Sequence, residues 1–186
     1  FNSASLHRHI SQSYKFDHFT HGFVEILAAE QTLSDSSWFQ GTADAVRKHM
    51  THFLNHRFDH ILILSGDQLY NMDFRKAFDE HIANDAELTV ATIPVNREAV
   101  SGFGIMQIDE KQRIREFAEK PKDEAVIDFL RIPDTTRHEL NIKATDDQFL
   151  ASMGIYIFNR DVLVDLLDSD HADFGKHIIP KAIQTR

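Results

Sequence analysis

The residue best suited to metal chemistry is Asp67, in the segment LSGDQLYNMDF (64–74). The preceding residues, HILILSGD (60–67), form a continuous apolar run that ends in Ser-Gly-Asp. This pattern is typical of a buried parallel strand that leads into a functional turn. Ligands of open α/β sheets bind beyond the carboxyl ends of the strands, where a carboxylate can hold Mg²⁺ against phosphates. The alternative is that Asp67 caps the next helix, and local features favour neither interpretation.

A second candidate pair, Glu119 and Lys120, lies in FAEKP (117–121). Pro121 biases Lys120 toward an extended backbone, which would send the two side chains to opposite sides. A lysine directed into a cleft supplies a point charge for phosphate, and a glutamate accepts hydrogen bonds from sugar hydroxyls. Judged on this segment alone, a solvated ion pair at a strand end is the favoured interpretation.

A third candidate surface lies on ASMGIYIF (151–158). If this segment is a strand, Ser152, Gly154 and Tyr156 share one face and apolar residues the other. Two hydroxyls around a gap suit a surface that faces a sugar. The alternative, equally supported, is a half-buried Tyr156 with its hydroxyl at the rim.

The segment SSWFQGTADAV carries the fourth candidate. Gly41 and Thr42 can begin a helix that Thr42 caps, with Asp44 in its first turn, and a helix N-terminus attracts phosphate. Trp38, beside Phe39, is suited to stacking on a base or to packing in the core. We expect Trp38 to lie in the core.

Four histidines, His49, His52, His56 and His60, recur on one face of a predicted helix. His52 and His56 have the spacing of a zinc-binding pair. However, no glutamate follows His52 as in an HExxH motif, and the chain contains no cysteine. We therefore expect a partly solvated polar face and no metal site there.

The elements that must position these residues alternate between strands and helices. The predicted strands are 22–28, 60–67, 87–95, 103–109, 113–121 and 149–158. The predicted helices are 3–14, 41–58, 72–85, 122–132, 160–168 and 175–184, and 133–147 is expected to be a surface loop or hairpin. Such alternation predicts a single α/β domain with a mixed sheet and helices on both faces.

Composition excludes several classes of protein. Hydrophobic residues at 42% and charged residues at 26% are ordinary for a globular protein. A formal net charge of −9 disfavours nucleic-acid binding. No apolar run approaches the roughly 20 residues that a membrane span needs, and the first residues lack the apolar core of a signal peptide. We therefore expect a cytoplasmic protein with no nucleic-acid or membrane partner.

Taken together, these segments resemble the glucose-1-phosphate adenylyltransferase family (ADP-glucose pyrophosphorylases). The resemblance is carried in order along the chain by FNSASLHRHI, FVEILAAEQT, WFQGTADAV, LSGDQLYNMDF, FGIMQID, FAEKPK, ASMGIYIF and DFGKHIIP. It implies a Rossmann-like nucleotidyltransferase fold with a mixed, mostly parallel sheet. It also implies transfer of AMP from ATP to glucose-1-phosphate with Mg²⁺ and release of pyrophosphate, for synthesis of glycogen- or starch-type glucans.

The resemblance assigns roles residue by residue. Asp67 matches the family's metal-binding aspartate and, with Lys120 on the sugar phosphate, carries the catalytic role. The positions that match the lining of the sugar-phosphate site are Glu119, Lys120, Ser152, Tyr156, Asp173 and Phe174. Phe39 and Gly41 fall in the segment that meets the nucleotide. Two departures, Gln68 where many relatives have His and Asn71 where many have Arg, touch none of these assignments.

The resemblance further implies that residues 1–186 are part of a catalytic domain. The family's Gly-rich nucleotide loop, of the GGxGxRL type, belongs before Phe1. A second metal-binding aspartate and a C-terminal β-helix domain belong beyond Arg186. The chain alone is therefore expected to be inactive, and the full-length protein to be a homotetramer. Two alternatives stay open: a transferase for another sugar phosphate or nucleotide, and a catalytically dead regulatory subunit of the same fold.

Overall fold

The computed structural model describes residues 4–17, 19, 22–28, 38–139 and 147–186, which fall into two units, Phe1–Phe39 and Gln40–Arg186. In the first unit, the predicted N-terminal helix is present as α1 (Ala4–Ser13). The predicted strand at 22–28 is wrong, because the structure has no strand there. Its apolar side chains are exposed, Phe23 by 59% and Val24 by 46%. An apolar β-type sequence becomes a strand only when a partner strand satisfies its backbone groups.

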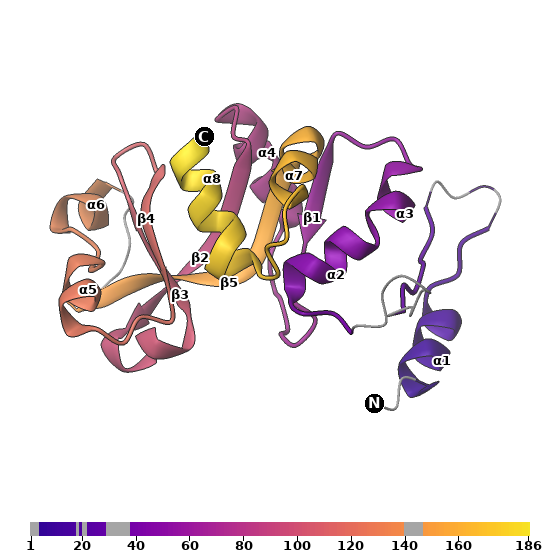
Figure 1. Ribbon diagram of the computed structural model, residues 1–186, viewed down its shortest axis with the longest axis horizontal. Coiled ribbons are helices and arrows are strands. Elements are labelled where there is room, and N and C mark those ends of the chain that lie inside the picture. The colour runs from indigo at the N-terminus through magenta and orange to yellow at the C-terminus, as the bar shows by residue number, and fades with distance from the viewer. Residues whose placement is uncertain (1–3, 18, 20–21, 29–37, 140–146) are drawn as a thin grey trace. The chain divides into compact units, whose positions relative to one another are not determined.

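The described residues of the second unit form five strands and most of the helices (Figure 1). The strands are β1 (His60–Ile63), β2 (Leu88–Asn96), β3 (Gly104–Ile108), β4 (Ile114–Glu119) and β5 (Gln148–Asn159). The helices are α2 (Thr42–Lys48), α3 (Met50–Leu54), α4 (Phe74–Ala83), α5 (Glu124–Phe129), α6 (Asp134–Glu139), α7 (Arg160–Leu167) and α8 (Ile179–Thr185). A 3₁₀ turn, η1 (Arg97–Gly102), precedes β3, and a π-helical turn, η2 (Phe174–Ile178), leads into α8.

The predicted elements of this unit are largely confirmed, with two local corrections. The helix expected at 41–58 is interrupted at His49 and forms α2 and α3. The expected loop at 133–147 begins instead with α6, where Asp134 lies in the first turn and Arg137 in the last, as the helix dipole favours. The rest of that segment, 140–146, lies outside the described residues.

The expectation of a mostly parallel sheet is wrong for the strands that the structure describes, since every pairing among them is antiparallel. The C-terminal half of β5 pairs with both β1 and β2. These two strands therefore run in the same direction, as the strand–helix alternation predicts, but β5 lies between them in the opposite direction. The alternation indicates the direction of successive strands and contains no information about a later strand that inserts between them.

Strand β5 is interrupted by a bulge at Gly154. Its neighbour β2 pairs Val90 with Tyr156 and Thr92 with Ser152, so that three residues of β5 stand opposite one of β2. Gly154 has a φ of 68°, which glycine adopts without the steric cost that a side chain would add. On its other side, β5 pairs with β3 before the bulge and with β1 after it. The bulge thus faces the gap between the ends of β1 and β3.

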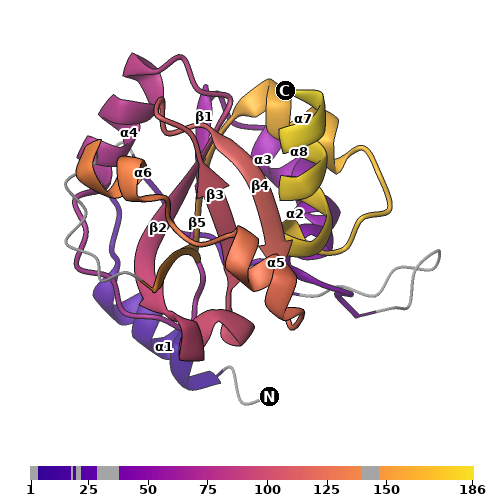
Figure 2. The same ribbon diagram turned by 90° about the vertical axis from the view of Figure 1, so that its left-hand side faces the viewer.

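The core of this unit lies mainly on one side of the sheet. Helices α2, α7 and α8 cover that side, and α4 lies on the other (Figure 2). The largest buried cluster contains Ala43, Tyr156, Phe158, Val162, Leu163, Leu166, Leu167, Phe174, Ile178, Ile179 and Ala182. Burying one such large apolar side chain stabilises a fold by about 1.5–3 kcal/mol. None of the helices in the described part of the chain has the length and apolar character that a membrane crossing demands.

Candidate functional site

The loop after β1 is held against the bulge of β5 by its own side chains. The Asp67 carboxylate accepts a hydrogen bond from the Ser65 hydroxyl, and the Tyr70 hydroxyl donates to the Ser65 carbonyl. The Gln68 amide donates to the carbonyl of Met153 at 2.9 Å. The structure therefore places Asp67 at the gap between β1 and β3, beside the bulge.

Asp67 does not cap the following helix. The N-cap of α4 is Asp73, whose carboxylate accepts from the backbone N–H of Arg75 at 3.1 Å. The alternative interpretation of Asp67 as a helix cap is therefore wrong. Asp67 is exposed, with its carboxylate held by Ser65.

Asp67 offers a single carboxylate to a metal ion. In the part of the chain that the structure describes, no group of three or more His, Cys, Asp or Glu residues could hold a metal ion. Mg²⁺ typically binds proteins through one or two carboxylates and takes its remaining ligands from water and substrate phosphates. A single exposed carboxylate on a loop tied at both ends fits that requirement.

At the end of β4, Glu119 and Lys120 do not project to opposite sides. Lys120 has a φ of 48°, and its backbone N–H donates to the Phe103 carbonyl at 2.9 Å. Its Nζ lies 3.6 Å from Oε1 of Glu119. Pro121 disfavours the right-handed helical region for the preceding residue, and the backbone takes the left-handed alternative in place of the extended one. Such conformations cost about 1–3 kcal/mol and gather at functional sites.

Tyr156 lies at the centre of the candidate site and is 8% exposed. Burial raises the pKa of its hydroxyl, a hydrogen bond with Ser152 acts in the opposite direction, and the negative charges of Glu119 and Asp173 raise the pKa further. The tyrosine is therefore a neutral donor and acceptor at neutral pH. The Glu119 and Asp173 carboxylates lie near each other, since Glu119 Oε2 and Asp173 Oδ1 stand 2.5 and 3.5 Å from an ideal Cβ on Gly175. The burial of Tyr156 excludes the alternative in which this residue is only half-buried.

Asp173 and Phe174 have different placements. The Asp173 carboxylate caps η2 by accepting from the Lys176 backbone N–H at 3.0 Å. Phe174 is 2% exposed, and its ring packs on that of Tyr156 with 5.5 Å between centroids. The Phe174 ring therefore supports Tyr156 from within the core and does not line an open surface.

The start of α2 is already occupied by protein atoms. The backbone N–H groups of Ala43 and Asp44 donate to the Ala172 carbonyl at 2.9 and 3.1 Å. The prediction that Thr42 caps the helix is wrong, because the N-cap is Gly41. The Thr42 hydroxyl instead accepts a hydrogen bond from the backbone N–H of Phe174. A Cβ on Gly41 would stand 2.3 Å from the Ala172 oxygen. Gly41 thus permits close packing of two backbone segments.

The aromatic residues before α2 belong to the first unit. The expectation that Trp38 lies in the core is wrong, because its side chain is 69% exposed. Phe39 is half-buried. Since Phe39 and Gly41 belong to different units, their joint role at a nucleotide stays a prediction.

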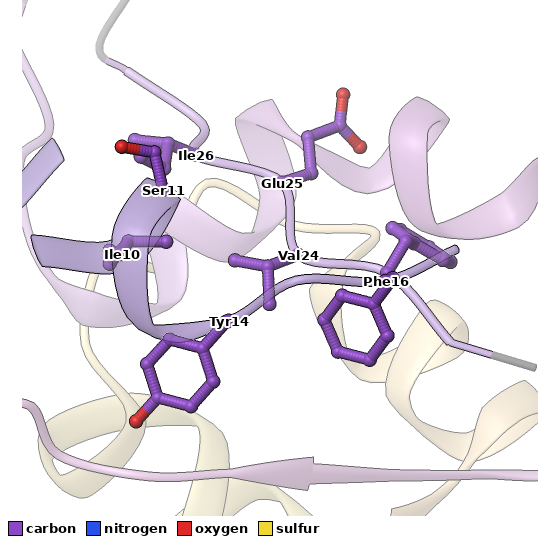
Figure 3. Close-up of a pocket in the computed structure, with 8 residues that line it drawn as sticks. Ile10, Ser11, Tyr14, Phe16, Val24, Glu25 and Ile26 are labelled. Carbon is purple, nitrogen blue, oxygen red and sulfur yellow. The ribbon is translucent and has the colours of Figure 1, made fainter. Parts of the chain in front are cut away.

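A pocket of about 480 Å³ lies in the first unit (Figure 3). It is lined by Ile10, Ser11, Tyr14, Phe16, Phe23, Val24, Glu25 and Ile26. Figure 3 shows apolar side chains around the space and the Glu25 carboxylate directed away from Tyr14 and Val24. No lysine or arginine is among these eight residues, so the pocket lacks the charge that a phosphate requires.

Sequence reasoning missed His81. This residue of α4 is 1% exposed, and its ring nitrogens hydrogen-bond Thr89 Oγ1 at 2.7 Å and Asn159 Oδ1 at 2.9 Å. It joins α4 to β2 and β5, and nothing in its spacing signals this role. Of the histidine face that was predicted, His52 is exposed, and His49 is buried with its ring edge-on to that of His52.

Comparison with known families gives the class of the protein. The whole chain, residues 1–186, matches the nucleotidyl transferase family, and the protein belongs to this family. Its members transfer a nucleotidyl group to a sugar phosphate on a Rossmann-like fold, so a nucleoside triphosphate and a sugar phosphate are the substrates that the family implies. Membership confirms the predicted class of enzyme and leaves the particular substrates to be proposed.

Proposed function

We propose that the protein transfers AMP from ATP to glucose-1-phosphate, giving ADP-glucose and pyrophosphate. The observation that carries this proposal is a pair of neighbouring carboxylates, Glu119 and Asp173, beside Gly175, with Nζ of Lys120 3.6 Å from Glu119. Ser152 and Tyr156, joined by a hydrogen bond, supply the hydroxyls. The choice of ATP and glucose-1-phosphate rests on WFQGTADAV together with FGKHIIP, which favour the ADP-glucose branch of the family.

The chemistry of the cluster suits a sugar phosphate. The carboxylates of Glu119 and Asp173 accept hydrogen bonds from sugar hydroxyls, and the neutral hydroxyls of Ser152 and Tyr156 both donate and accept. The Lys120 side chain is 56% exposed, and its ammonium group is free to turn from Glu119 to the phosphate. A lysine acts on phosphate as a compact point charge.

The reaction needs positioning more than a protein nucleophile. A phosphate oxygen of glucose-1-phosphate attacks the α-phosphorus of ATP, the new P–O bond forms, and the bond to pyrophosphate breaks. Asp67 would hold Mg²⁺ against the phosphates, and the bound ion supplies neutralisation of the charge on the α-phosphate. Lys120 and the carboxylates fix the sugar phosphate in line with the leaving group.

We place the nucleotide base and triphosphate on other parts of the site. Phe39 and Gly41 lie in the segment proposed to meet the nucleotide. We further propose that the active form is a homotetramer of the full-length protein. Experiments on activity accordingly use the full-length protein that carries this sequence.

Pyrophosphate release measured over a matrix of substrates tests the proposal. ATP, UTP, GTP and CTP are each combined with glucose-1-phosphate, mannose-1-phosphate and N-acetylglucosamine-1-phosphate, with Mg²⁺ present. We expect the highest kcat/KM for ATP with glucose-1-phosphate. A higher kcat/KM for another pair would show that this other pair, and not ATP with glucose-1-phosphate, is the substrate pair. Binding of both substrates without turnover would favour a regulatory subunit.

A further inference from the structure

The carboxylate of Glu119 lies in a slot between two glycines from separate elements. An ideal Cβ on Gly104, at the start of β3, would stand 2.8 Å from Glu119 Oε2. An ideal Cβ on Gly175, in η2, would stand 2.5 Å from the same oxygen and 3.0 Å from Cδ. Real Cβ atoms do not approach other heavy atoms so closely, so a methyl group at either position would displace the carboxylate.

These glycines are not required by the backbone. Among the glycines that the structure describes, only Gly154 has a φ in the left-handed region that favours glycine, so Gly104 and Gly175 adopt conformations open to any residue. Glycine in a helical segment or a strand is also destabilising relative to alanine. The missing side chain therefore leaves room for neighbouring groups: the Glu119 carboxylate at Gly175, and the Phe117 ring together with that carboxylate at Gly104.

The second oxygen of the carboxylate is oriented toward the proposed phosphate-binding lysine. Oε1 lies 3.6 Å from Nζ of Lys120, and the Glu119 side chain is 19% exposed. Gly104 also pairs with Glu119 in the β3–β4 ladder, where the ring of Phe117 approaches within 2.4 Å of the Cβ position. Gly175 has a simpler environment, since the nearest atoms to its Cβ position belong to the Glu119 carboxylate and, at 3.5 Å, to Asp173.

We propose that Gly104 and Gly175 are positioning residues, which set the Glu119 carboxylate at the place where it accepts from a sugar hydroxyl. This inference rests on the proposed function, because it assumes that Glu119 contacts the sugar. The glycines contribute through Glu119 and touch no reacting atom. A methyl group at residue 175 would push the carboxylate outward, while the flexible glutamate side chain absorbs the displacement at little cost to folding.

The test measures steady-state kinetics of the full-length protein with Gly175→Ala, Glu119→Asp and the double variant. Gly175→Ala is expected to raise KM for glucose-1-phosphate about ten-fold, with KM for ATP unchanged, because misplacing one charged hydrogen bond weakens binding of that substrate alone. Glu119→Asp withdraws the carboxylate by one methylene and empties the slot. In the Glu119→Asp background, adding Gly175→Ala should therefore change KM less than two-fold. Gly102→Ala is the matched control, since nothing lies within 4 Å of its Cβ position.

The outcomes separate this inference from the proposed function. If Glu119→Gln leaves KM for glucose-1-phosphate unchanged, Glu119 does not contact the sugar and both ideas fail. If Glu119→Gln raises that KM but Gly175→Ala does not, only the positioning role is overturned. Equal effects of Gly175→Ala in the Glu and Asp backgrounds would likewise overturn it. If Gly175→Ala alone fails to fold, the double variant decides: recovery of folding supports the slot, and continued unfolding contradicts it.

Discussion

Asp67→Asn should separate catalysis from stability in the full-length protein. The substitution removes one negative charge and keeps the shape of the side chain. The hydrogen bond that the structure gives to Asp67 comes from the Ser65 hydroxyl, and an asparagine Oδ1 accepts it equally well. Since the residue is exposed and does not cap α4, the free energy of unfolding should change by less than about 0.5 kcal/mol.

The effect on turnover should be far larger. Asp67 is proposed to hold Mg²⁺, whose charge stabilises the transition state by several kcal/mol. A loss of about 2.7–4 kcal/mol corresponds to a fall in kcat of roughly 100- to 1,000-fold. The assay is pyrophosphate release at saturating ATP and glucose-1-phosphate, paired with thermal unfolding of the same preparations.

Asp73 supplies the matched control on the same loop. Asp73→Ala removes the cap of α4 and should cost about 1 kcal/mol of stability, while kcat stays within a few-fold of wild type. Asp73→Asn should change neither quantity, because asparagine caps as well as aspartate. An Asp67→Asn protein with near-normal kcat, or one that loses as much stability as Asp73→Ala, would refute the reasoning.

Three further substitutions test separate parts of the account. Lys120→Ala should raise KM for glucose-1-phosphate about ten- to 150-fold, because a charge-assisted hydrogen bond to phosphate contributes about 1.5–3 kcal/mol. KM for ATP should change little, and equal changes in both KM values would show that the lysine is not part of the sugar-phosphate site. Asp44 has its pKa lowered: burial alone would raise it, but the Gln40 N–H and two cations on α2 outweigh burial. Its stabilising contribution is therefore full above the unfolded pKa of about 3.9 and is lost as pH falls below that value. The difference in free energy of unfolding between wild type and Asp44→Asn should shrink as pH falls from about 5 to about 2. A difference that stays constant with pH in urea unfolding would contradict this. Gly41→Ala should destabilise the fold by about 1–3 kcal/mol, because its Cβ would meet a backbone carbonyl, and a Tm equal to that of wild type would show that the close packing is dispensable.

Local features of the fold could be predicted from the sequence, because short-range patterns determine them. The hairpin of β3 and β4 follows from two apolar runs joined by a short polar turn, and the structure pairs Gly104 with Glu119 as that arrangement requires. The same holds for β5 and α7, where a long apolar strand leads into a helix. The position of β5 between β1 and β2 could not be predicted, since periodicity within a strand says nothing about its partners.

In the candidate site, too, the sequence indicates which residues take part but not how they are arranged. Resemblance to the family predicts that Glu119, Ser152, Tyr156 and Asp173 share one site; the structure shows Ser152 hydrogen-bonded to Tyr156 and both carboxylates beside Gly175. What the spacing could not provide was their geometry. The left-handed backbone of Lys120 and the glycine slot around Glu119 both depend on contacts between segments distant in the sequence. The outward position of Trp38 was missed for a related reason, because a large aromatic residue suggests burial only on average.

The most direct test of the account is a crystal structure of the full-length protein bound to glucose-1-phosphate. We expect the sugar hydroxyls within hydrogen-bond distance of the Glu119 and Asp173 carboxylates and the Tyr156 hydroxyl, with the phosphate on Nζ of Lys120. Density for the sugar phosphate elsewhere, such as in the pocket lined by Tyr14 and Phe23, would contradict the central claim that this cluster is the sugar-phosphate site.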